Sequence, residues 1–401
     1  MNSVKTSPRR RFVRNSLAAA LLSGSLLAGA SFAQEPIKIG FIGTLSGPGG
    51  ALGQDQYDAF MLKIQQNGGK LGGAPVTVVR EDDQLKPDVG VQAATKLLKS
   101  ENVQIITGVT FSNVMMAIHK PITEAEVLLI GSNAGPAPIA GKQCSPWFFS
   151  TSWDNDQLHE AGGQLTSDLG YKNVYVMAAN YQAGRDAVSG FKRDFTGKVI
   201  DEVYTQVNQP DYSAEIAQLQ AANPDAVYVF YPGGMGVNFV KQYRQAGLLG
   251  KVPLISAASI DGTTLPALKT LAVGAITSAP YAPNIDNPQN KQFVEAFEKA
   301  YKRPPSMYAA QSYDAATLLD AALAKVNGDA SNKQALRDAV RTVDFQSVRG
   351  AFKFDSNQIA DGAFYRVDVV ASSDGTGAEL KAVSPITIKT RANLAAQCPI
   401  K

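Results

Sequence analysis

The stretch that decides the fold is Ile37-Lys38-Ile39-Gly40-Phe41-Ile42, followed by Gly43-Thr44-Leu45-Ser46-Gly47-Pro48-Gly49-Gly50. Its first six residues predict a buried strand, and its Gly- and Pro-containing remainder predicts a loop. Helical periodicity follows over about 52–67, and a second β-branched run covers 75–79. A strand, a loop, a helix and another strand in this order predict a βαβ unit with parallel strands.

The same alternation continues to residue 131, and after a break it begins again. The break, at 132–156, is rich in Gly, Pro, Ser and aromatic residues. Two such halves predict an α/β protein with two doubly wound, Rossmann-like lobes and a cleft between them. In the first half, the remaining predicted elements are helix 87–100, strand 103–107, helix 113–125 and strand 127–131. In the second half they are helix 157–169, strand 173–178, helix 184–195, strand 199–205, helix 212–222, strand 226–231, helix 236–246 and strand 252–256.

Beyond Tyr281 the alternation stops. The predicted elements there are helices 287–301, 306–327 and 332–342 and extended segments 348–354 and 364–371. Helices without intervening strands cannot build a third doubly wound domain, so we expect them to cover the lobes already formed. Crossings near 153, 281 and 345 then make a three-segment hinge. The predicted division is 34–153 with 282–345 for lobe one, and 154–281 with 346–401 for lobe two.

The first 33 residues have the pattern of a secretory signal peptide. Four arginines, at 9, 10, 11 and 14, precede an uncharged apolar stretch from about Leu17 to Phe32. That stretch is shorter than a membrane-spanning helix needs, and Ser31-Phe32-Ala33 offers the small residues of a cleavage site. We expect cleavage after Ala33, export by the Sec or the twin-arginine route, and a periplasmic chain without a lipid anchor.

The charge balance argues against nucleic acid and anionic membranes as partners. The whole chain carries 38 basic and 35 acidic residues, but residues 1–33 contain five of the basic ones and none of the acidic ones. The mature part therefore has 33 basic and 35 acidic residues, a net charge of −2. We expect it to be a monomer without attraction to polyanions.

The sequence lacks the motifs of a histidine metal site, of a nucleophile elbow and of nucleotide binding. The two histidines, His119 and His159, have no metal-ligating neighbour at i+4, so we expect packing residues and no metal site. The loop after the first strand does not fit GxSxG, and Leu52 stands where a dinucleotide motif needs its third glycine. No GxxxxGK motif precedes Ser or Thr. We therefore predict no cofactor and no enzymatic activity.

Ligands of open α/β sheets bind beyond the carboxyl ends of the strands. In lobe one, small hydroxyl, amide and glycine residues stand at three such ends, in 44–50, 110–113 and 132–135. Loops of this kind expose N–H groups suited to a carboxylate. In lobe two the corresponding loops carry Asn180-Tyr181, Tyr231-Pro232-Gly233-Gly234 and Ser259-Ile260-Asp261-Gly262. Trp153, at the first crossing, either lines the pocket or packs the hinge.

The order of these segments resembles the branched-chain amino acid binding proteins of ABC importers. The resemblance is carried by Ile37 to Gly40 with Leu45-Ser46-Gly47, by the loops around Ser112 and Ser132 to Pro136, and by Phe148-Phe149-Ser150-Thr151. It covers essentially the whole mature chain. It implies capture of a small ligand by lobe closure and delivery to an inner-membrane permease with separate ATPase subunits. A ligand-sensing receptor of the same fold is the alternative.

The resemblance also implies roles for individual residues. Ser112 and the loop Asn133-Ala134-Gly135 would hold a carboxylate, Tyr181 would close over the ligand, and Asp261 would hold an ammonium group. The family's usual acid is Glu, and Asp is one methylene shorter, which leaves aromatic carboxylates open as ligands beside amino acids. A wide aromatic pocket would suit them, formed by Phe111, Trp153, Tyr181, Tyr231 and Tyr308. The complete candidate site is Ser46, Phe111, Ser112, Asn133, Ala134, Gly135, Trp153, Tyr181, Tyr231, Asp261 and Tyr308.

The chain has two cysteines, Cys144 and Cys398. An oxidising compartment permits a disulfide between them that would fix the C-terminal tail, and two unpaired thiols are the alternative.

Overall fold

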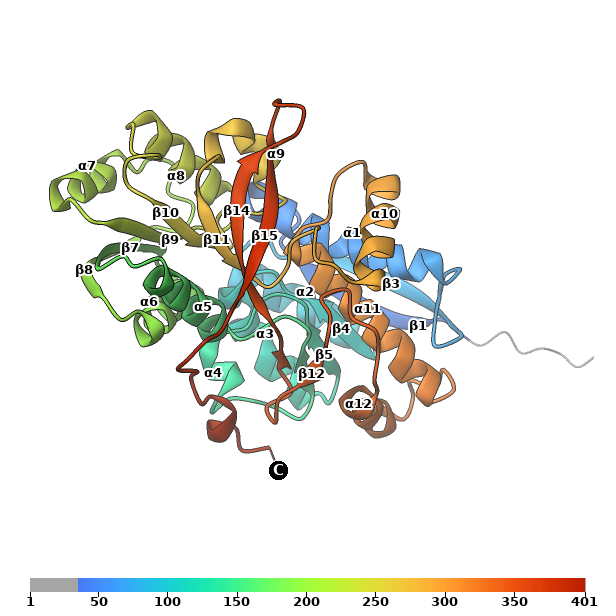
Figure 1. Ribbon diagram of the computed structural model, residues 1–401. Coiled ribbons are helices and arrows are strands. Elements are labelled where there is room, and N and C mark those ends of the chain that lie inside the picture. Colours follow the sequence, from blue (N-terminus) through green and yellow to red (C-terminus); the bar gives the residue numbers. More distant parts are fainter. Residues whose placement is uncertain (1–34, 401) are drawn as a thin grey trace, which may run out of the picture. The chain divides into compact units, whose positions relative to one another are not determined.

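A computed structural model describes residues 35–400 of the chain. It contains two large sheets with helices packed around them (Figure 1). The predicted α/β class with two doubly wound lobes is confirmed, because each sheet has a parallel core and its own set of helices. The first sheet has the order β2(Lys70–Leu71), β3(Ala74–Asp82), β1(Ile37–Gly43), β4(Ile105–Gly108), β5(Leu128–Gly131), β6(Phe148–Ser150). The second has the order β15(Ala378–Ile386), β14(Phe364–Ala371), β11(Ile276–Ala279), β10(Leu254–Ala257), β9(Ala226–Phe230), β7(Asn173–Ala179), β8(Lys198–Thr205).

The first sheet is buried on both faces. Strand β1 lies between β3 and β4 and is parallel to both. Ile39 and Phe41 face one apolar cluster, shared with α1(Gly50–Gln66) and α11(Met307–Lys325), while Ile42 faces another, shared with α2(Pro87–Lys99) and α3(Ser112–Glu124). Alternate residues of one strand therefore serve two cores, which explains why the strand has a continuous apolar run.

The second sheet is built in the same way around β7, β9 and β10. Its helices are α5(Asn155–Asp168), α6(Gln182–Asp194), α7(Ser213–Ala222) and α8(Gly234–Gln245). Tyr228 on β9 is fully buried, stacks on Phe191 at 4.2 Å between ring centroids and lies 2.6 Å from the Nδ1 atom of His159. Burial lowers the pKa of His159 to about 3, so this histidine is a neutral packing residue.

The chain returns to both sheets after residue 281. Helices α11 and α12(Lys333–Thr342) pack in the core of the first sheet, and β14 and β15 extend the second sheet as an antiparallel pair. Phe352 and Phe354 also pack on the first-sheet core, and Ile359 forms a parallel bridge with Ser150. We therefore propose that the third crossing lies after 361 rather than near 345. The remaining helices are α4(Ala137–Ala140), α9(Leu265–Leu268) and α10(Pro288–Tyr301), and β12(Lys353–Phe354) pairs with β13(Ala360–Asp361).

A disulfide joins Cys144, in the loop before β6, to Cys398 near the C-terminus. The tail between β15 and Cys398 is also held by hydrogen bonds to lobe two. The Thr390 N–H donates to Asp194 at 2.8 Å, and the Ala392 N–H donates to Glu160 at 2.7 Å. The tail thus runs across α5 and α6 and is anchored in lobe one.

Asp154 lies at the crossing between the lobes and caps α5 by accepting from the Gln157 N–H at 2.9 Å. Burial, with a smaller contribution from Asp156 and Glu160, raises its pKa to about 8. A carboxyl whose pKa is raised on folding stabilises the fold fully below its unfolded pKa, near 4, and loses that contribution as the pH rises through 8.

Asp154→Asn keeps the cap but removes the titrating proton. We expect the variant to be more stable than the wild type at pH 8.5, with the difference vanishing toward pH 4. Denaturant unfolding at a series of pH values measures this. An equal difference at every pH would contradict the assignment.

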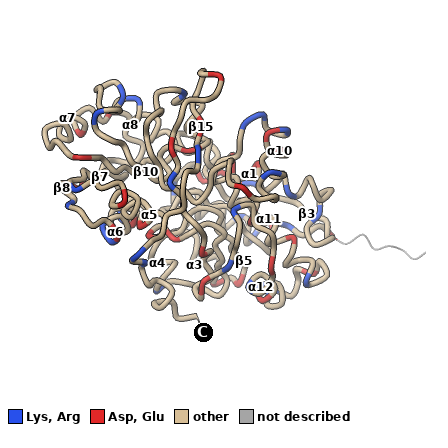
Figure 2. Tube along the Cα trace, in the orientation of Figure 1, with Lys and Arg blue, Asp and Glu red and all other residues tan. Residues whose placement is uncertain are grey.

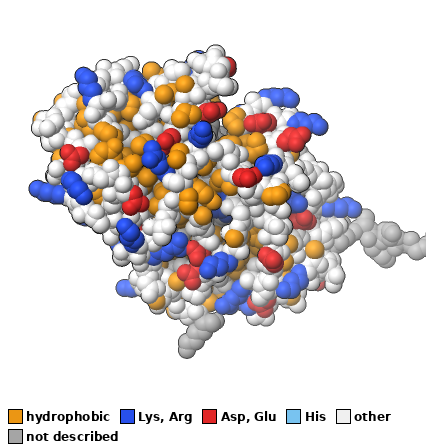
Figure 3. All heavy atoms as spheres, in the orientation of Figure 1, with side chains coloured by type: hydrophobic (Ala, Val, Ile, Leu, Met, Phe, Trp, Pro, Cys, Tyr) orange, Lys and Arg blue, Asp and Glu red, His pale blue; other side chains and the backbone are white. Residues whose placement is uncertain are grey.

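Charged side chains of both signs are interspersed on the face seen in Figures 2 and 3. Many form exposed pairs, such as Lys38 with Glu101 and Lys120 with Glu124. Between residues 35 and 400, no helix has the length and apolar character needed to span a membrane.

Candidate functional site

A small enclosed cavity lies where the carboxyl ends of the two sheets meet. Its volume is about 30 Å³, which is room for about two water molecules. Small-molecule sites usually measure about 300–1,000 Å³, so a ligand fits here only if the lobes move apart. Its lining residues are Leu52, Thr110, Phe111, Ser112, Asn133, Ala134, Trp153, Asn155, Leu158, Tyr181, Ala183, Phe230, Pro232, Ala258 and Tyr308.

Seven residues of the predicted site line this cavity. They come from both lobes and from the crossing between them, although up to about 200 residues separate them in the chain. Trp153 both lines the cavity and stands at the crossing, so the two interpretations offered for it are compatible. The seven are Phe111, Ser112, Asn133, Ala134, Trp153, Tyr181 and Tyr308.

Tyr231, another residue of the predicted site, does not line the cavity. Its ring packs between Tyr212 and Phe239 inside lobe two, and its hydroxyl lies 3.2 Å from Thr205. Successive side chains of a strand point to opposite faces, so when Tyr231 faces the core, the preceding Phe230 faces the cavity.

Three other predicted residues also lie outside the lining of this cavity. Ser46 is exposed and hydrogen-bonds to the Asp82 carboxylate. Gly135 is structural, because a Cβ atom there would lie 2.1 Å from the Trp153 carbonyl oxygen. Asp261 lines a smaller neighbouring cavity, which shares Ala258 with the first.

The N-termini of two helices, one from each lobe, meet at the cavity. Ser112 is the first residue of α3, and Ala183 is the second residue of α6. The N-cap residues of these helices, Phe111 for α3 and Tyr181 for α6, make no side-chain capping hydrogen bond. First-turn N–H groups have no partner within their helix and carry the positive end of its dipole. The cavity therefore offers two sets of donors to an anion.

Aromatic rings supply the walls. Tyr181 stacks on Phe230, with 6.1 Å between centroids and 15° between planes, and lies 6.3 Å from Phe111 of lobe one. Trp153 completes this side. No residue that lines the cavity is Asp, Glu, Lys, Arg or His. Only helix dipoles and neutral polar groups would thus balance a ligand's charge, which favours an anion over a cation.

Two residues beside the cavity have a left-handed backbone. Val109 has φ 62° and follows β4, while Ala258 has φ 53° and follows β10. A β-branched residue in this region is a genuine outlier. The Val109 N–H donates to the Ile42 carbonyl at 2.6 Å, and its own carbonyl accepts from the Ala134 N–H at 3.1 Å. Such strain clusters at ligand sites and here shapes the loops that carry Phe111 and Ala134.

Asp186 of α6 connects the cavity to lobe one. Its Oδ2 atom accepts from the Ala137 N–H of α4 at 3.2 Å and from the Asn155 amide at 2.8 Å. The same amide donates to the Ser112 hydroxyl at 3.1 Å, and the Asp186 Oδ1 atom accepts from Gln182 at 2.8 Å. Asp186 thus orients Asn155, which lines the cavity, and directly joins the two lobes.

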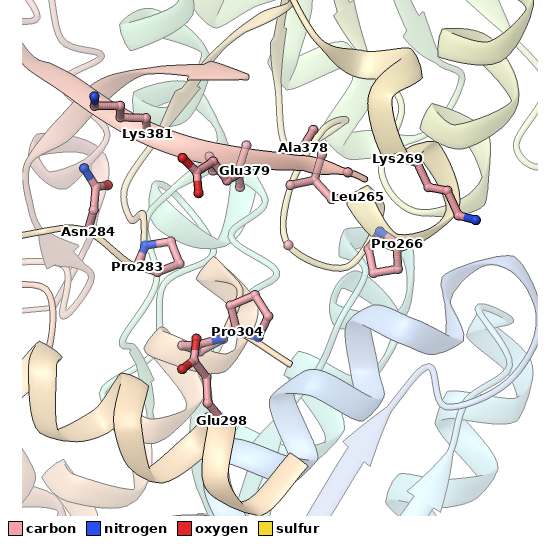
Figure 4. A pocket seen from close by; sticks show the side chains of 14 residues that line it. Leu265, Pro266, Lys269, Pro283, Asn284, Glu298, Pro304, Ala378, Glu379 and Lys381 are labelled. Atoms are coloured by element: carbon pink, nitrogen blue, oxygen red, sulfur yellow. The ribbon is translucent and has the colours of Figure 1, made fainter. Parts of the chain in front are cut away.

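A larger cavity, of about 610 Å³, lies between β15, the turn around α9 and the segment after α10 (Figure 4). Glu379 and Glu298 point into it from opposite sides, and both are exposed. It shares Pro283, Pro305 and Leu380 with the small cavity that contains Asp261. None of the predicted site residues lines it.

The described residues include no group of His, Cys, Asp and Glu arranged to hold a metal ion. The lining residues that sequence reasoning missed include Asn155, Ala183 and Phe230. Asn155 and Ala183 each follow a predicted site residue by two positions; Asn155 is the first residue of α5, and Ala183 is the second residue of α6. Asn155 and Ala183 could have been predicted from their positions, because each lies where a helix begins just after the end of a strand.

The chain is similar to solute-binding proteins in sequence and in structure. Residues 36–376 match the family model described as periplasmic binding protein. A solute-binding protein of an ABC transporter from R. palustris, solved in complex with benzoate, is 32% identical, covers 88% of this chain and 98% of its own, and has a TM-score of 0.83. A solute-binding protein from Rhodopseudomonas palustris BisB5, solved with 3,4-dihydroxybenzoic acid, is 26% identical over 88% of this chain and 98% of its own, with a TM-score of 0.82.

The Leu/Ile/Val-binding protein homolog 6 of Brucella melitensis is 28% identical over 368 residues, which is 89% of this chain and 93% of that protein. The family match covers most of the chain, and the relatives are covered almost completely. The chain therefore belongs to the periplasmic binding protein family, within the group that includes the Leu/Ile/Val-binding proteins.

Proposed function

We propose that this chain captures a small aromatic carboxylate between its lobes and delivers it to an ABC permease with separate ATPase subunits. The carrying observation is the cavity with two uncapped helix N-termini, aromatic walls and no acidic lining residue. Helix N-termini suit the carboxylate and the rings suit an aryl group. The relatives solved with benzoate and with 3,4-dihydroxybenzoic acid support this ligand class.

The same lining argues against an α-amino acid. Its ammonium group is bonded to the carbon that carries the carboxylate, so both charges would lie in one small cavity. An ammonium buried without a carboxylate partner costs several kcal/mol. Asp261, the acid assigned to this role by resemblance, lines the neighbouring cavity, which no residue of α3 or α6 lines. It is therefore not beside the groups that would hold the carboxylate, where an α-ammonium would lie.

Delivery follows from closure. A ligand shifts the lobes toward the closed form only if it contacts both, and Ser112 of lobe one and Tyr181 of lobe two line the same cavity. The proposed setting is a periplasm, reached by means of the signal peptide predicted at 1–33, which lies outside the described residues. We propose that the chain acts as a monomer and without catalytic activity.

A thermal-unfolding screen tests the ligand class. Benzoate, 4-hydroxybenzoate, leucine and phenylalanine are added to the mature chain in excess. A ligand at 100 times its Kd adds about 2.7 kcal/mol to stability. We expect both aromatic acids to raise Tm and both amino acids to leave it unchanged. A rise with leucine alone would contradict the proposal.

Asp186→Asn tests the connection between closure and the cavity. In the variant, an amide NH₂ group replaces Oδ2 and faces the Ala137 and Asn155 donors, which then lose their acceptor. If the amide is flipped, its NH₂ group faces the Gln182 donor instead. We expect benzoate to bind roughly 10-fold more weakly, mainly through faster dissociation, as for a lost hydrogen bond to a charged group. Stopped-flow fluorescence measures the rate. Glu202→Gln, in an exposed pair with Lys192, is the control; equal dissociation rates in the two variants would remove Asp186 from the closure mechanism.

A further inference from the structure

Among the described residues that line the ligand cavity or its smaller neighbour, two have a buried polar side-chain atom without a hydrogen-bond partner. These atoms are the Tyr308 hydroxyl and the Asp261 Oδ2 atom. Tyr308 is 1% exposed and Asp261 is 3% exposed. Buried polar groups nearly always have a partner, and each exception requires an explanation. A ligand group that supplies the missing partner is one such explanation.

The two atoms belong to adjoining spaces. Tyr308 lines the ligand cavity and Asp261 the neighbouring one, and Ala258 lines both. Met307, the residue before Tyr308, also lines the space beside Asp261. Burial and, after it, the Asp261 carboxylate raise the pKa of the Tyr308 hydroxyl well above its usual range.

Asp261 is held in a fixed orientation. Its Oδ1 atom accepts from both the N–H and the hydroxyl of Thr263, each at 2.6 Å, which leaves Oδ2 as the free acceptor. The nearby carboxylate of Asp55 is already bound by Ser306 and by Arg303, the latter at 2.9 Å. Burial raises the pKa of Asp261 to about 6, so at pH 7.5 it is mostly ionised and requires a donor.

We propose that Tyr308 and Asp261 form a polar subsite that selects aromatic carboxylates bearing a ring hydroxyl. The inference rests on the proposed function and specifies its ligand. A phenolic hydroxyl is both donor and acceptor, so it donates to the Asp261 Oδ2 atom and accepts from the Tyr308 hydroxyl. An unsubstituted ring leaves both protein groups unpaired, which sites built for a hydroxyl discriminate against strongly.

A calorimetric titration of the wild-type mature chain at pH 7.5 is the first test. Benzoate, 4-fluorobenzoate and 4-hydroxybenzoate share the carboxylate and ring, and only the last can donate from the ring. We expect 4-hydroxybenzoate to bind at least about 10-fold more tightly than the other two, as for a hydrogen bond to a charged group. Equal affinities for all three would overturn the subsite and leave the proposed function intact. No binding of any of them would instead overturn the proposed function.

Two variants assign the preference to the residues. Tyr308→Phe removes only the hydroxyl, and Asp261→Asn removes the charge at constant shape. In each, the ratio of the benzoate Kd to the 4-hydroxybenzoate Kd should fall at least about 3-fold, while the benzoate Kd changes less than this. Tyr212→Phe is the matched control, because the Tyr212 hydroxyl is also buried and unpartnered but lies inside lobe two, outside the lining of the ligand cavity.

The control variant should keep the wild-type ratio. A preference that survives in both Tyr308→Phe and Asp261→Asn would overturn the assignment. Circular dichroism establishes that each variant is folded. If a variant is not folded, the affinities of the wild-type chain for the three benzoates decide whether the subsite exists.

Discussion

Tyr181→Ala is expected to weaken benzoate binding at least about 30-fold, which corresponds to about 2 kcal/mol. Tyr181 stacks on Phe230 of its own lobe and faces Phe111 of the other. Its removal deletes the wall through which lobe two contacts the ligand, and it fills the cavity with water. Isothermal titration calorimetry measures the loss.

The matched control is Tyr171→Ala, on the same lobe. Tyr171 is partly exposed, packs on the core from outside and does not line the cavity. It should keep the wild-type affinity. A Tyr181→Ala protein that unfolds like the wild type and still binds benzoate with unchanged Kd would show that lobe two does not hold the ligand here.

Gly135→Ala is expected to lower both stability and affinity. The added Cβ atom would lie 2.1 Å from the Trp153 carbonyl oxygen and 3.0 Å from the Asp154 Cα atom. Both are backbone atoms, so the loop and the crossing must separate. Overpacking of this kind costs about 1–3 kcal/mol. Because the loop carries Asn133 and Ala134, we also expect benzoate affinity to fall by roughly 30- to 100-fold.

Gly362→Ala is the control for this prediction, since nothing lies within 4 Å of its added Cβ atom. Thermal unfolding and calorimetry of both variants separate the two effects. A Gly135→Ala protein as stable as Gly362→Ala and equally able to bind would mean that the close approach of loop and crossing has no role in forming the site.

The fold was predictable because its information is local. Ile39 and Phe41 pack in one apolar core and Ile42 packs in another, on the two faces of the same strand. This requirement produces the continuous apolar run that predicts a parallel sheet. Strand β15 was missed for the opposite reason. It is an edge strand whose side chains are mostly exposed, and it contains Pro385, so it lacks that pattern.

The site was predictable where a loop position alone fixes it, as for Ser112 and Tyr181, which stand at strand-to-helix turns. The choice between Phe230 and Tyr231 depends on which face of β9 meets the cleft, and neighbouring apolar residues give no signal for that. The contact of Asp186 with Ala137 and Asn155 depends on how the lobes meet. That geometry arises from tertiary packing, and neither the sequence around Asp186 nor the sequence from Ala137 to Asn155 predicts it.

In the proposed function, the N-termini of α3 and α6 hold the carboxylate of the ligand. Calorimetric titration of the mature chain with benzoate and with benzamide tests it most directly, because the two ligands share size and ring but only one is an anion. We expect benzamide to bind at least about 30-fold more weakly than benzoate. Equal affinity for the two would contradict it.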